Sequence, residues 1–226
     1  MDLAKQYNNF ADDFSKNHDL GENSNNLNRE VFYSHLDFVR PGMKLLDLAC
    51  GDGTDLVYYK KLGANIYGLD ASDGLIKIAE AKSELEGVSL KVGLFENIPF
   101  EDSYFDVVLS KYAIMTSANM EPVFKEIHRV LKPGGMMMYL VTHPFRQFFE
   151  KREEKADYFE QKIVDSHILG NTVTVKEPTH TMTGFLNNFL FKNFDVQSYD
   201  ERWDPAAEFI DGKKYPGFLI LKAKKR

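Results

Sequence analysis

The chain has 226 residues, of which 43% are hydrophobic and 27% are charged, and its formal net charge at pH 7 is −6. This length and apolar content fit a single globular domain with a sizeable core, and they exclude a chain that is disordered throughout. The acidic balance argues against nucleic acid as a partner. Nucleic-acid binders usually carry a basic patch, and the one visible basic cluster is the tail at residues 222–226.

Cys50 is the only cysteine, so the chain cannot form an internal disulfide, which fits a reducing compartment. Residues 1–10 lack the apolar segment of a signal peptide, and no run of 18 apolar residues occurs anywhere. We therefore expect a cytoplasmic protein that does not enter a membrane. The sequence leaves open whether it is a monomer or a homodimer.

Two helices are predicted at the N-terminus, at about residues 3–14 and 27–39, because apolar side chains recur there at helical spacing. The polar segment 19–28 is expected to be a loop between them. Pro41-Gly42 ends the second helix.

From residue 44 onward, short apolar runs alternate with helical patterns, which is typical of βαβ units and a mainly parallel sheet. Strands are expected at 44–49, 65–69, 88–92, 106–110 and 136–142, and helices at 54–62, 72–85 and 119–131.

The composition changes between residues 144 and 178, and we interpret this stretch as an insertion between core elements. The pattern predicts a helix at 145–162 and a short strand at 172–175. A further helix at 181–192 and two closing strands, at 194–199 and 218–223, complete the chain.

The segment LDLACGDGT at residues 46–54 carries the main chemical signal. A strand runs into a turn with Gly51 and Gly53, and glycine allows positive φ angles and a close approach of a ligand to the backbone. Asp70 ends the next strand, where doubly wound folds place an acidic residue that binds ribose hydroxyls. The pattern therefore indicates a nucleoside-containing ligand.

The turn does not suit a dinucleotide. A third glycine would be needed at Leu56 to hold a pyrophosphate, and Asp47, Asp52 and Asp55 make the turn acidic. Such acidity suits the cationic methionyl part of S-adenosylmethionine. A nucleotide-dependent oxidoreductase is accordingly disfavoured.

Several segments, in this order, resemble the class I S-adenosylmethionine-dependent methyltransferases, especially the small-molecule branch related to ubiquinone and menaquinone biosynthesis. The resemblance covers about residues 40–143 closely and 180–223 more loosely. It implies an α/β, Rossmann-like doubly wound sheet of seven strands, mostly parallel with an antiparallel last strand and helices on both faces. The matching segments are LDLACGDG, GLDAS, residues 93–100, FDVVLS and LKPGG.

The resemblance also implies S-adenosylmethionine as cofactor, S-adenosylhomocysteine as product and no metal. It places the glycine turn and the end of the fourth strand near the methionyl group, Asp70 at the ribose and the segment around Phe95 at the adenine. An aromatic residue of the first helix closes the site. The expected cofactor-binding residues are Tyr7, Asp47, Ala49, Gly51, Gly53, Asp70, Ala71, Phe95, Glu96, Ser110 and Lys111.

Two histidines are candidate catalytic residues. His143 follows the fifth strand directly, and strand ends face the ligand crevice in this fold. His180 precedes a helix in a segment that resembles one near the substrate pocket of small-molecule methyltransferases. A histidine has a suitable pKa for a general base. Each could equally be a structural histidine with satisfied hydrogen bonds.

We expect one methyltransferase domain over residues 1–226, which transfers a methyl group to a small-molecule acceptor by in-line displacement. Two alternatives stay open: a non-catalytic protein that binds S-adenosylmethionine or S-adenosylhomocysteine, and a methyltransferase that acts on a protein or RNA. The domain divides into a helical cap at 1–40, a cofactor-binding core at 41–143, a lid or specificity insertion at 144–178 and the rest of the core at 179–226.

Overall fold

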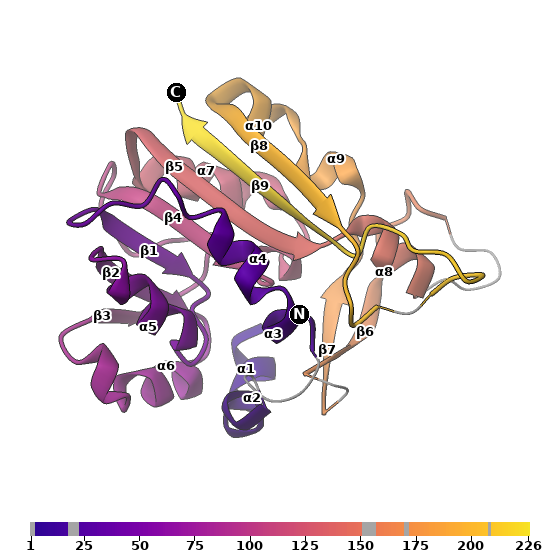
Figure 1. Cartoon of the computed structure of the whole chain (residues 1–226), viewed down its shortest axis with the longest axis horizontal. Helices are drawn as coiled ribbons and strands as arrows, with labels where there is room; N and C mark the ends of the chain where they lie inside the picture. Colours follow the sequence, from indigo (N-terminus) through magenta and orange to yellow (C-terminus); the bar gives the residue numbers. More distant parts are fainter. Residues whose placement is uncertain (1–2, 18–22, 151–156, 170–171, 208) are drawn as a thin grey trace.

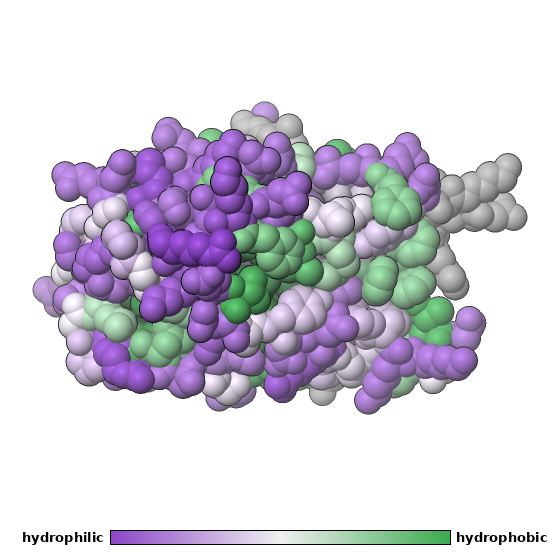
Figure 2. Space-filling model, turned by 90° about the horizontal axis from the view of Figure 1, so that it is seen from above, coloured by the Kyte–Doolittle hydropathy of each residue, from purple (hydrophilic) through white to green (hydrophobic). Residues whose placement is uncertain are grey.

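The computed structural model describes residues 3–17, 23–150, 157–169, 172–207 and 209–226. A central sheet runs through the molecule with helices on both of its faces, and a smaller hairpin lies beside the N-terminal helices (Figure 1). The surface seen in Figure 2 is mainly hydrophilic, and apolar side chains gather there in small groups. Each helix within the described ranges is too short or too polar to cross a membrane.

The main sheet has seven strands in the order β3-β2-β1-β4-β5-β9-β8. The pairs β1–β2, β2–β3, β1–β4 and β4–β5 are parallel, whereas β9 is antiparallel to both of its neighbours. The expected Rossmann-like sheet with an antiparallel last strand is therefore confirmed. The strands are β1 (Lys44–Leu48), β2 (Asn65–Asp70), β3 (Ser89–Val92), β4 (Phe105–Lys111), β5 (Leu131–Thr142), β8 (Phe194–Arg202) and β9 (Phe218–Lys225).

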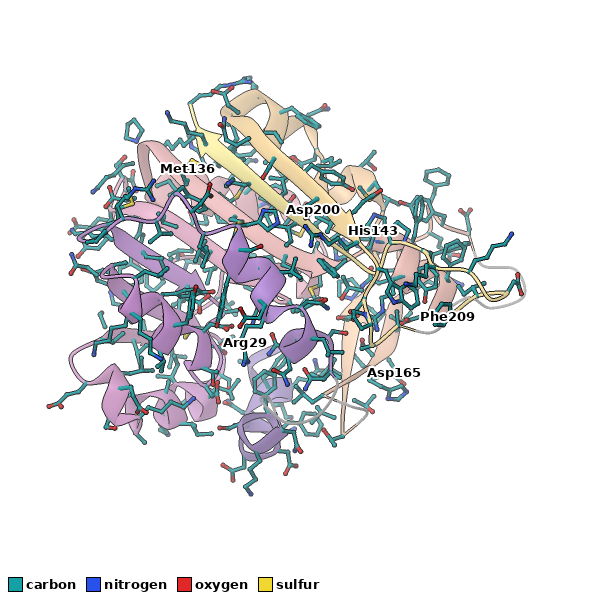
Figure 3. All side chains as sticks on the ribbon, in the orientation of Figure 1. Arg29, Met136, His143, Asp165, Asp200 and Phe209 are labelled. Carbon is teal, nitrogen blue, oxygen red and sulfur yellow. The ribbon has the colours of Figure 1, made fainter. Side chains whose placement is uncertain are left out.

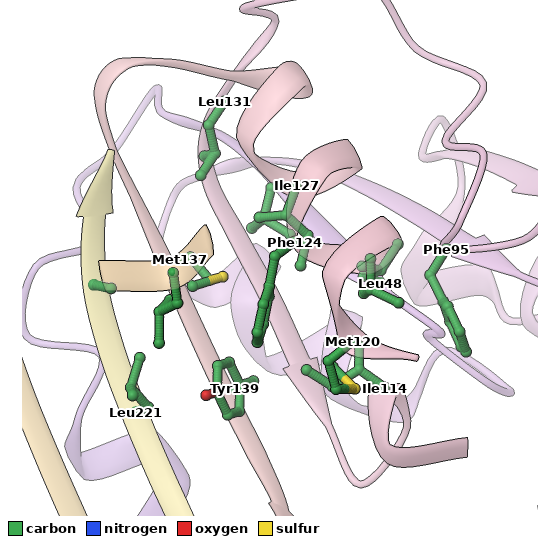
Figure 4. Packing of buried hydrophobic residues seen from close by; sticks show 14 of the residues in the cluster. Leu48, Phe95, Ile114, Met120, Phe124, Ile127, Leu131, Met137, Tyr139 and Leu221 are labelled. Atoms are coloured by element: carbon green, nitrogen blue, oxygen red, sulfur yellow. The ribbon is translucent and has the colours of Figure 1, made fainter. Parts of the chain in front are cut away.

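Helices cover both faces of the sheet, which explains why its central strands are almost continuously apolar. On one face, α4, α5 and α6 pack against side chains such as Leu45. On the other, α7, α9 and α10 pack against side chains such as Tyr139, which lies beside Phe124 with ring centroids 5.8 Å apart (Figure 4). The helices are α4 (Arg29–Ser34), α5 (Thr54–Lys61), α6 (Asp73–Glu80), α7 (Met120–Val130), α9 (Met182–Phe185) and α10 (Asn188–Asn193).

Helix boundaries follow local capping chemistry. Ser72 caps α6 through a hydrogen bond from the Leu75 N–H, as its position predicts. The single helix expected at 181–192 is wrong, because the chain forms two short helices there. The Asn187 side chain accepts a hydrogen bond from the Leu190 N–H and so starts α10 afresh.

The N-terminal helices are also more broken than the periodicity predicts. The expected helix at 3–14 is divided into α1 (Leu3–Asn8) and α2 (Ala11–Asn17), and α3 (Ser24–Leu27) lies within the expected loop. The Asn8 side chain accepts hydrogen bonds from the Ser72 hydroxyl and the Gly74 N–H of α6. Tertiary contacts of this kind override local helical preference.

The insertion consists of α8 (Pro144–Glu150) and a hairpin of β6 (Ile163–Ile168) and β7 (Val173–Pro178). The helix expected at 145–162 ends at Glu150. Residues 151–156 lie outside the described ranges, and residues 157–162 are not helical. The hairpin packs Val173 and Val175 against aromatic side chains of the N-terminal helices, so the two segments form one cap. The sequence predicts one strand of this hairpin, at 172–175, and does not predict β6.

Candidate functional site

A cavity of about 510 Å³ lies where β1, β2 and β4 end, between the sheet and the cap. In an open α/β sheet the carboxyl ends of the strands are the usual place for a ligand. One wall comes from the strand ends and the turns that follow them, and the other from α1, α2, α3, α8 and the β6–β7 hairpin.

The glycine turn after β1 is part of the strand wall. Ala49, Gly51 and Gly53 all have positive φ angles, of 66°, 56° and 78°. Asp70 holds this turn in place, because one carboxylate oxygen accepts a hydrogen bond from the Gly51 N–H and the other accepts one from the Ser72 N–H, each at 2.8 Å. A carboxylate oxygen can accept more than one hydrogen bond, so Asp70 retains capacity toward the cavity that it lines.

The two glycines of the turn serve different purposes. A Cβ at Gly53 would lie 2.5 Å from Leu85 Cδ1 and 3.0 Å from Ala79 Cβ, so Gly53 is required by packing against the α6 region. A Cβ at Gly51 would meet only the Phe14 ring of α2, at 3.5 Å, and Gly51 lines the cavity. Gly51 therefore keeps the backbone accessible to a ligand beneath the cap.

A buried lysine ends β4 beside this turn. The Lys111 ammonium lies 2.7 Å from Asp55 Oδ2, and its side chain is 3% exposed. Apart from this ion pair, no described residue accepts a hydrogen bond from it. The next residue, Tyr112, has a φ angle of 52°, and both residues line the cavity. A buried donor of this kind marks a place where a ligand oxygen would be favourable.

The strand wall is acidic overall. Burial raises the pKa of Asp47 well above its usual range, and the neighbouring Asp55 raises it further, whereas Lys111 acts in the opposite direction. Burial also raises the pKa of Asp70, although the hydrogen bonds from Ser72 and Gly51 oppose the shift. Asp47, Asp55 and Asp70 thus face two cationic groups, the Lys111 ammonium and the Arg29 guanidinium, which lies 3.5 Å from Asp55 Oδ1. The remaining negative charge favours a ligand that carries positive charge. The arrangement fits the sulfonium and amine of S-adenosylmethionine.

The cap wall brings together side chains that are distant in the sequence. Tyr7 lines the cavity, and its pKa is raised by burial first and then by Glu177 and Asp70. The Gln147 amide of α8 donates to Glu177 Oε1 at 3.4 Å and to the Pro178 carbonyl at 3.3 Å. Most of this wall is polar, in contrast to the apolar sheet faces.

Arg146 joins three separate parts of the cap. Its guanidinium donates to Glu150 on the same helix, to the Ser24 hydroxyl of α3, and to Asp204, which is fully buried in the segment after β8. Because carboxylates contact the guanidinium on two sides, Arg146 acts as an internal tie and not as an open anion site.

The predicted cofactor residues divide into two groups. Seven of them line the cavity, namely Tyr7, Ala49, Gly51, Asp70, Ala71, Phe95 and Lys111. The remaining four, Asp47, Gly53, Glu96 and Ser110, lie outside its lining.

Two of those four are engaged elsewhere by hydrogen bonds. The Ser110 hydroxyl donates to the Leu48 carbonyl at 3.0 Å, and Glu96 accepts from the Ser117 hydroxyl at 2.7 Å. Ser110 therefore ties β4 to β1 behind the cavity.

Neither candidate catalytic histidine lines the cavity. His143 lies where β5 ends, beside α8 (Figure 3). Its Nδ1 accepts a hydrogen bond from the Phe145 N–H, and its Nε2 faces Glu201 at 3.2 Å. The Nε2 of His180 donates to the Met115 carbonyl at 2.7 Å. Burial lowers the pKa of both histidines, so each is neutral at pH 7.

Sequence reasoning missed most of the cap wall. Phe14, Gln147, Glu150 and Glu177 all line the cavity. The strand predicted at 172–175 lies mostly within β7 (Val173–Pro178), but the prediction stopped short of Glu177. No local signal indicated that α8 would face the glycine turn.

Residues 46–139 match a family model described as a methyltransferase domain. The chain is 38% identical over 107 residues to an uncharacterized methyltransferase of Synechocystis, a match that covers 46% of this chain and 50% of the relative. It is 36% identical over 108 residues to demethylmenaquinone methyltransferase of Staphylococcus aureus, covering 46% and 45%. The chain thus aligns with about half the length of these relatives.

A crystal structure from Listeria monocytogenes, solved as a candidate S-adenosylmethionine-dependent methyltransferase, superposes with a TM-score of 0.68. It is 25% identical, and the match covers 82% of this chain and 92% of that one. The family model covers the strands and turns that form the strand wall, and the structural match extends over most of the fold. Residues 46–139 are therefore similar to a methyltransferase domain, and the chain has the Rossmann-like fold of this solved methyltransferase structure.

Proposed function

We propose that this protein transfers a methyl group from S-adenosylmethionine to a small-molecule acceptor. The observation that carries the proposal is the cavity itself, which joins an open glycine turn, the Asp70 carboxylate and the buried Lys111 ammonium, whose one ion-pair partner among the described residues is Asp55. A cavity of about 510 Å³ is within the range of ligand sites.

The cofactor would lie along the strand wall. Asp70 would accept hydrogen bonds from the ribose hydroxyls, with Ala71 and Phe95 beside the adenine. Gly51 would approach the methionyl group through its backbone, and Lys111 would donate to the carboxylate of that group. Asp47 and Asp55 lie close behind and would favour its positive charge.

When bound, the cofactor supplies an activated methyl group on a positively charged sulfur, so the protein chiefly has to bind and align the two reactants. Correct orientation contributes about 7–11 kcal/mol in well-aligned reactions. Tyr7 and Phe14 of the cap would cover the cofactor and exclude water. The insertion would act as the lid, because its hairpin packs on the same N-terminal helices.

The acceptor would occupy the cap side of the cavity. The similar protein of Staphylococcus aureus is named demethylmenaquinone methyltransferase, and a small acceptor is consistent with a cavity of about 510 Å³. The wall offered by Arg146, Gln147, Glu150 and Glu177 is polar. We therefore expect the acceptor to present hydrogen-bonding groups on this side.

A general-base role for His143 or His180 remains a prediction. The variants His143→Asn and His180→Gln test it, because the new side chains can keep the hydrogen bonds to the Phe145 N–H and the Met115 carbonyl. A base would be revealed by a loss of about 10²–10⁴-fold in kcat with little change in stability. Unchanged turnover in the double variant would contradict the role.

The first experiment is calorimetric titration with S-adenosylhomocysteine, with NAD as comparator. We expect saturable binding of the first compound alone. Lys111→Met should weaken it by at least about tenfold, since the buried ammonium is lost, whereas the exposed Lys91→Met should not. Preference for NAD, or no binding of S-adenosylhomocysteine, would refute the cofactor assignment.

Methyl transfer itself is tested with S-adenosylmethionine labelled in its methyl group. The labelled cofactor is offered with a panel of small acceptors, with total protein and with total RNA. Label in a small molecule supports the proposal. Label only in protein or RNA, or cofactor binding without any transfer, favours the corresponding alternative.

A further inference from the structure

A second hollow lies on the other side of His180 from the large cavity. It has a volume of about 350 Å³ and is lined by the start of α7, residues 158–161 and the segment from Thr179 to Asn187. His180 lines this hollow and not the large cavity. The methyl-transfer site does not account for it.

The imidazole of His180 has one nitrogen without a partner. The residue is 6% exposed, and its Nε2 must donate a proton because its partner is the Met115 carbonyl, 2.7 Å away. Nδ1 therefore carries a lone pair, and no hydrogen-bond donor among the described residues reaches it. A Cβ at Gly184, which also lines the hollow, would meet Nδ1 at 3.6 Å, so Nδ1 faces the hollow.

The rest of the lining defines the charge of an occupant. Glu121 and Glu160 contribute carboxylates, which form ion pairs with Lys125 at 2.7 Å and with Lys162 at 3.5 Å. Neither lysine is among the lining residues in the described part of the chain. Tyr158 and Phe159 add aromatic rings, whose centroids are 5.3 Å apart, and Phe159 is 79% exposed. Carboxylates and aromatic faces both favour an organic cation.

We propose that this hollow is a binding site for a small organic ammonium ion. One N–H of the ammonium would donate to His180 Nδ1, the carboxylates would balance its charge, and its alkyl part would contact the aromatic rings. A carboxylate or phosphate ligand would find an acceptor and no donor at Nδ1.

His180 also links the hollow to the large cavity. The backbone N–H of His180 donates to Gln147 Oε1 at 3.1 Å, and its ring Nε2 donates to the Met115 carbonyl. Gln147 and Met115 both line the large cavity. An occupant that fixes the imidazole would therefore also fix two parts of the wall of the methyl-transfer site.

The test is an NMR titration of the whole protein with ethylammonium chloride, with sodium propionate as an anion of similar size. With ethylammonium alone, we expect the chemical shifts of the Thr183 and Gly184 amides and of the His180 ring nitrogens to change and then saturate. Residue-specific shifts separate this site from the large cavity, where the Gly51 and Ala71 amides report. The result is thus independent of whether S-adenosylhomocysteine binds.

Gly184→Ala is the decisive variant. The backbone of Gly184 lies outside the left-handed region, and the added methyl group makes only ordinary contacts, so the fold should be retained, as thermal unfolding would verify. The methyl group covers Nδ1, and we expect at least about a tenfold loss of ethylammonium affinity.

Two further variants address the individual contacts. His180→Gln should lower affinity because it keeps the donor to Met115 but lacks Nδ1. Glu121→Gln with Glu160→Gln should lower it severalfold, unlike the exposed Glu86→Gln. No shift at Thr183 and Gly184, equal shifts with propionate, or unchanged affinity in Gly184→Ala would overturn the proposal.

Discussion

The two walls of the large cavity are held together by different kinds of contact. In the strand wall, neighbouring strands fix the glycine turn through backbone groups, and the Asp70 carboxylate bonds the N–H groups of Gly51 and Ser72. In the cap wall, side chains make the connections, as in the pairing of Arg146 with Asp204 across 58 positions of the sequence. The first wall is part of the sheet core, whereas the second rests on a separate small apolar cluster.

This difference predicts different responses to substitution. A change in the strand wall should act on global stability, because the turn is continuous with the buried sheet. A substitution in the cap should lower the free energy of local opening, because few apolar groups attach the cap to the rest of the protein. In the proposed function, cofactor and acceptor would contact both walls, and a cap of low local stability on a rigid strand wall would suit a site that must open and close.

The largest effect is expected from Gly53→Ala. The new Cβ would lie 2.5 Å from Leu85 Cδ1, and the residue would keep a φ angle of 78°. Left-handed strain and overpacking together should lower the free energy of unfolding by about 2–5 kcal/mol, measured by urea denaturation.

Gly87→Ala is the matched control, because Gly87 has a φ angle of 79° and nothing within 4 Å of the added Cβ. We expect a loss of only about 1–2 kcal/mol from strain. Equal losses in the two variants would show that the α6 packing does not constrain the turn.

Asp47→Asn should stabilise the protein at neutral pH. Burial and Asp55 raise the pKa of Asp47 in the folded state, so the folded state binds more protons than the unfolded state between the ordinary carboxyl pKa and the raised one. Stability must then fall as pH rises through that window, and the asparagine variant avoids the loss. We expect a gain of about 1–2 kcal/mol at pH 7 that disappears near the ordinary carboxyl pKa.

Unfolding free energies measured from pH 4 to pH 8 would check this, with the exposed Asp13→Asn as control. A difference that is independent of pH would contradict the assignment of the effect to ionisation. In the proposed function, Asp47→Asn should lower the affinity for S-adenosylmethionine, whose sulfur is positively charged. It should lower the affinity for S-adenosylhomocysteine less, because the sulfur of that product is neutral.

The smallest global effect is expected from Gln6→Ala in the cap. The Gln6 amide donates to the Lys176 carbonyl at 3.2 Å and accepts from the Lys176 N–H at 2.8 Å, which ties α1 to β7. Removing both bonds should favour opening of the hairpin by about 1–2 kcal/mol, or about 5–30-fold faster hydrogen exchange there.

The free energy of global unfolding should change by less than about 0.5 kcal/mol in Gln6→Ala. Gln197→Ala is the control, since that exposed amide bonds only the nearby Asp195 carbonyl. If Gln6→Ala lowered global stability as much as Gly53→Ala, the cap could not be treated as a separate unit.

The strand wall was largely predictable from the sequence. Apolar runs, glycines and caps are local features, and strands that alternate with helices order themselves into a parallel sheet by general rules of connection. Gly51, Asp70 and Lys111 could be placed together because all three follow the ends of adjacent strands. The positions of Ser110 and Gly53 behind the cavity were not predictable, because the direction of a side chain near a turn depends on its packing partners.

Only the tertiary structure decided the cap. Asn8 reaches α6, Gln6 reaches β7 and Arg146 reaches Asp204, and each contact joins segments more than fifty positions apart. Contacts such as that of Asn8 break a predicted helix, and His143 makes hydrogen bonds with the Phe145 N–H and Glu201 and does not line the cavity. The sequence by itself determined the sheet and the glycine turn, because these depend on local backbone preferences and apolar periodicity. The cap wall depends on which distant side chains meet, and that is settled only when the chain is folded.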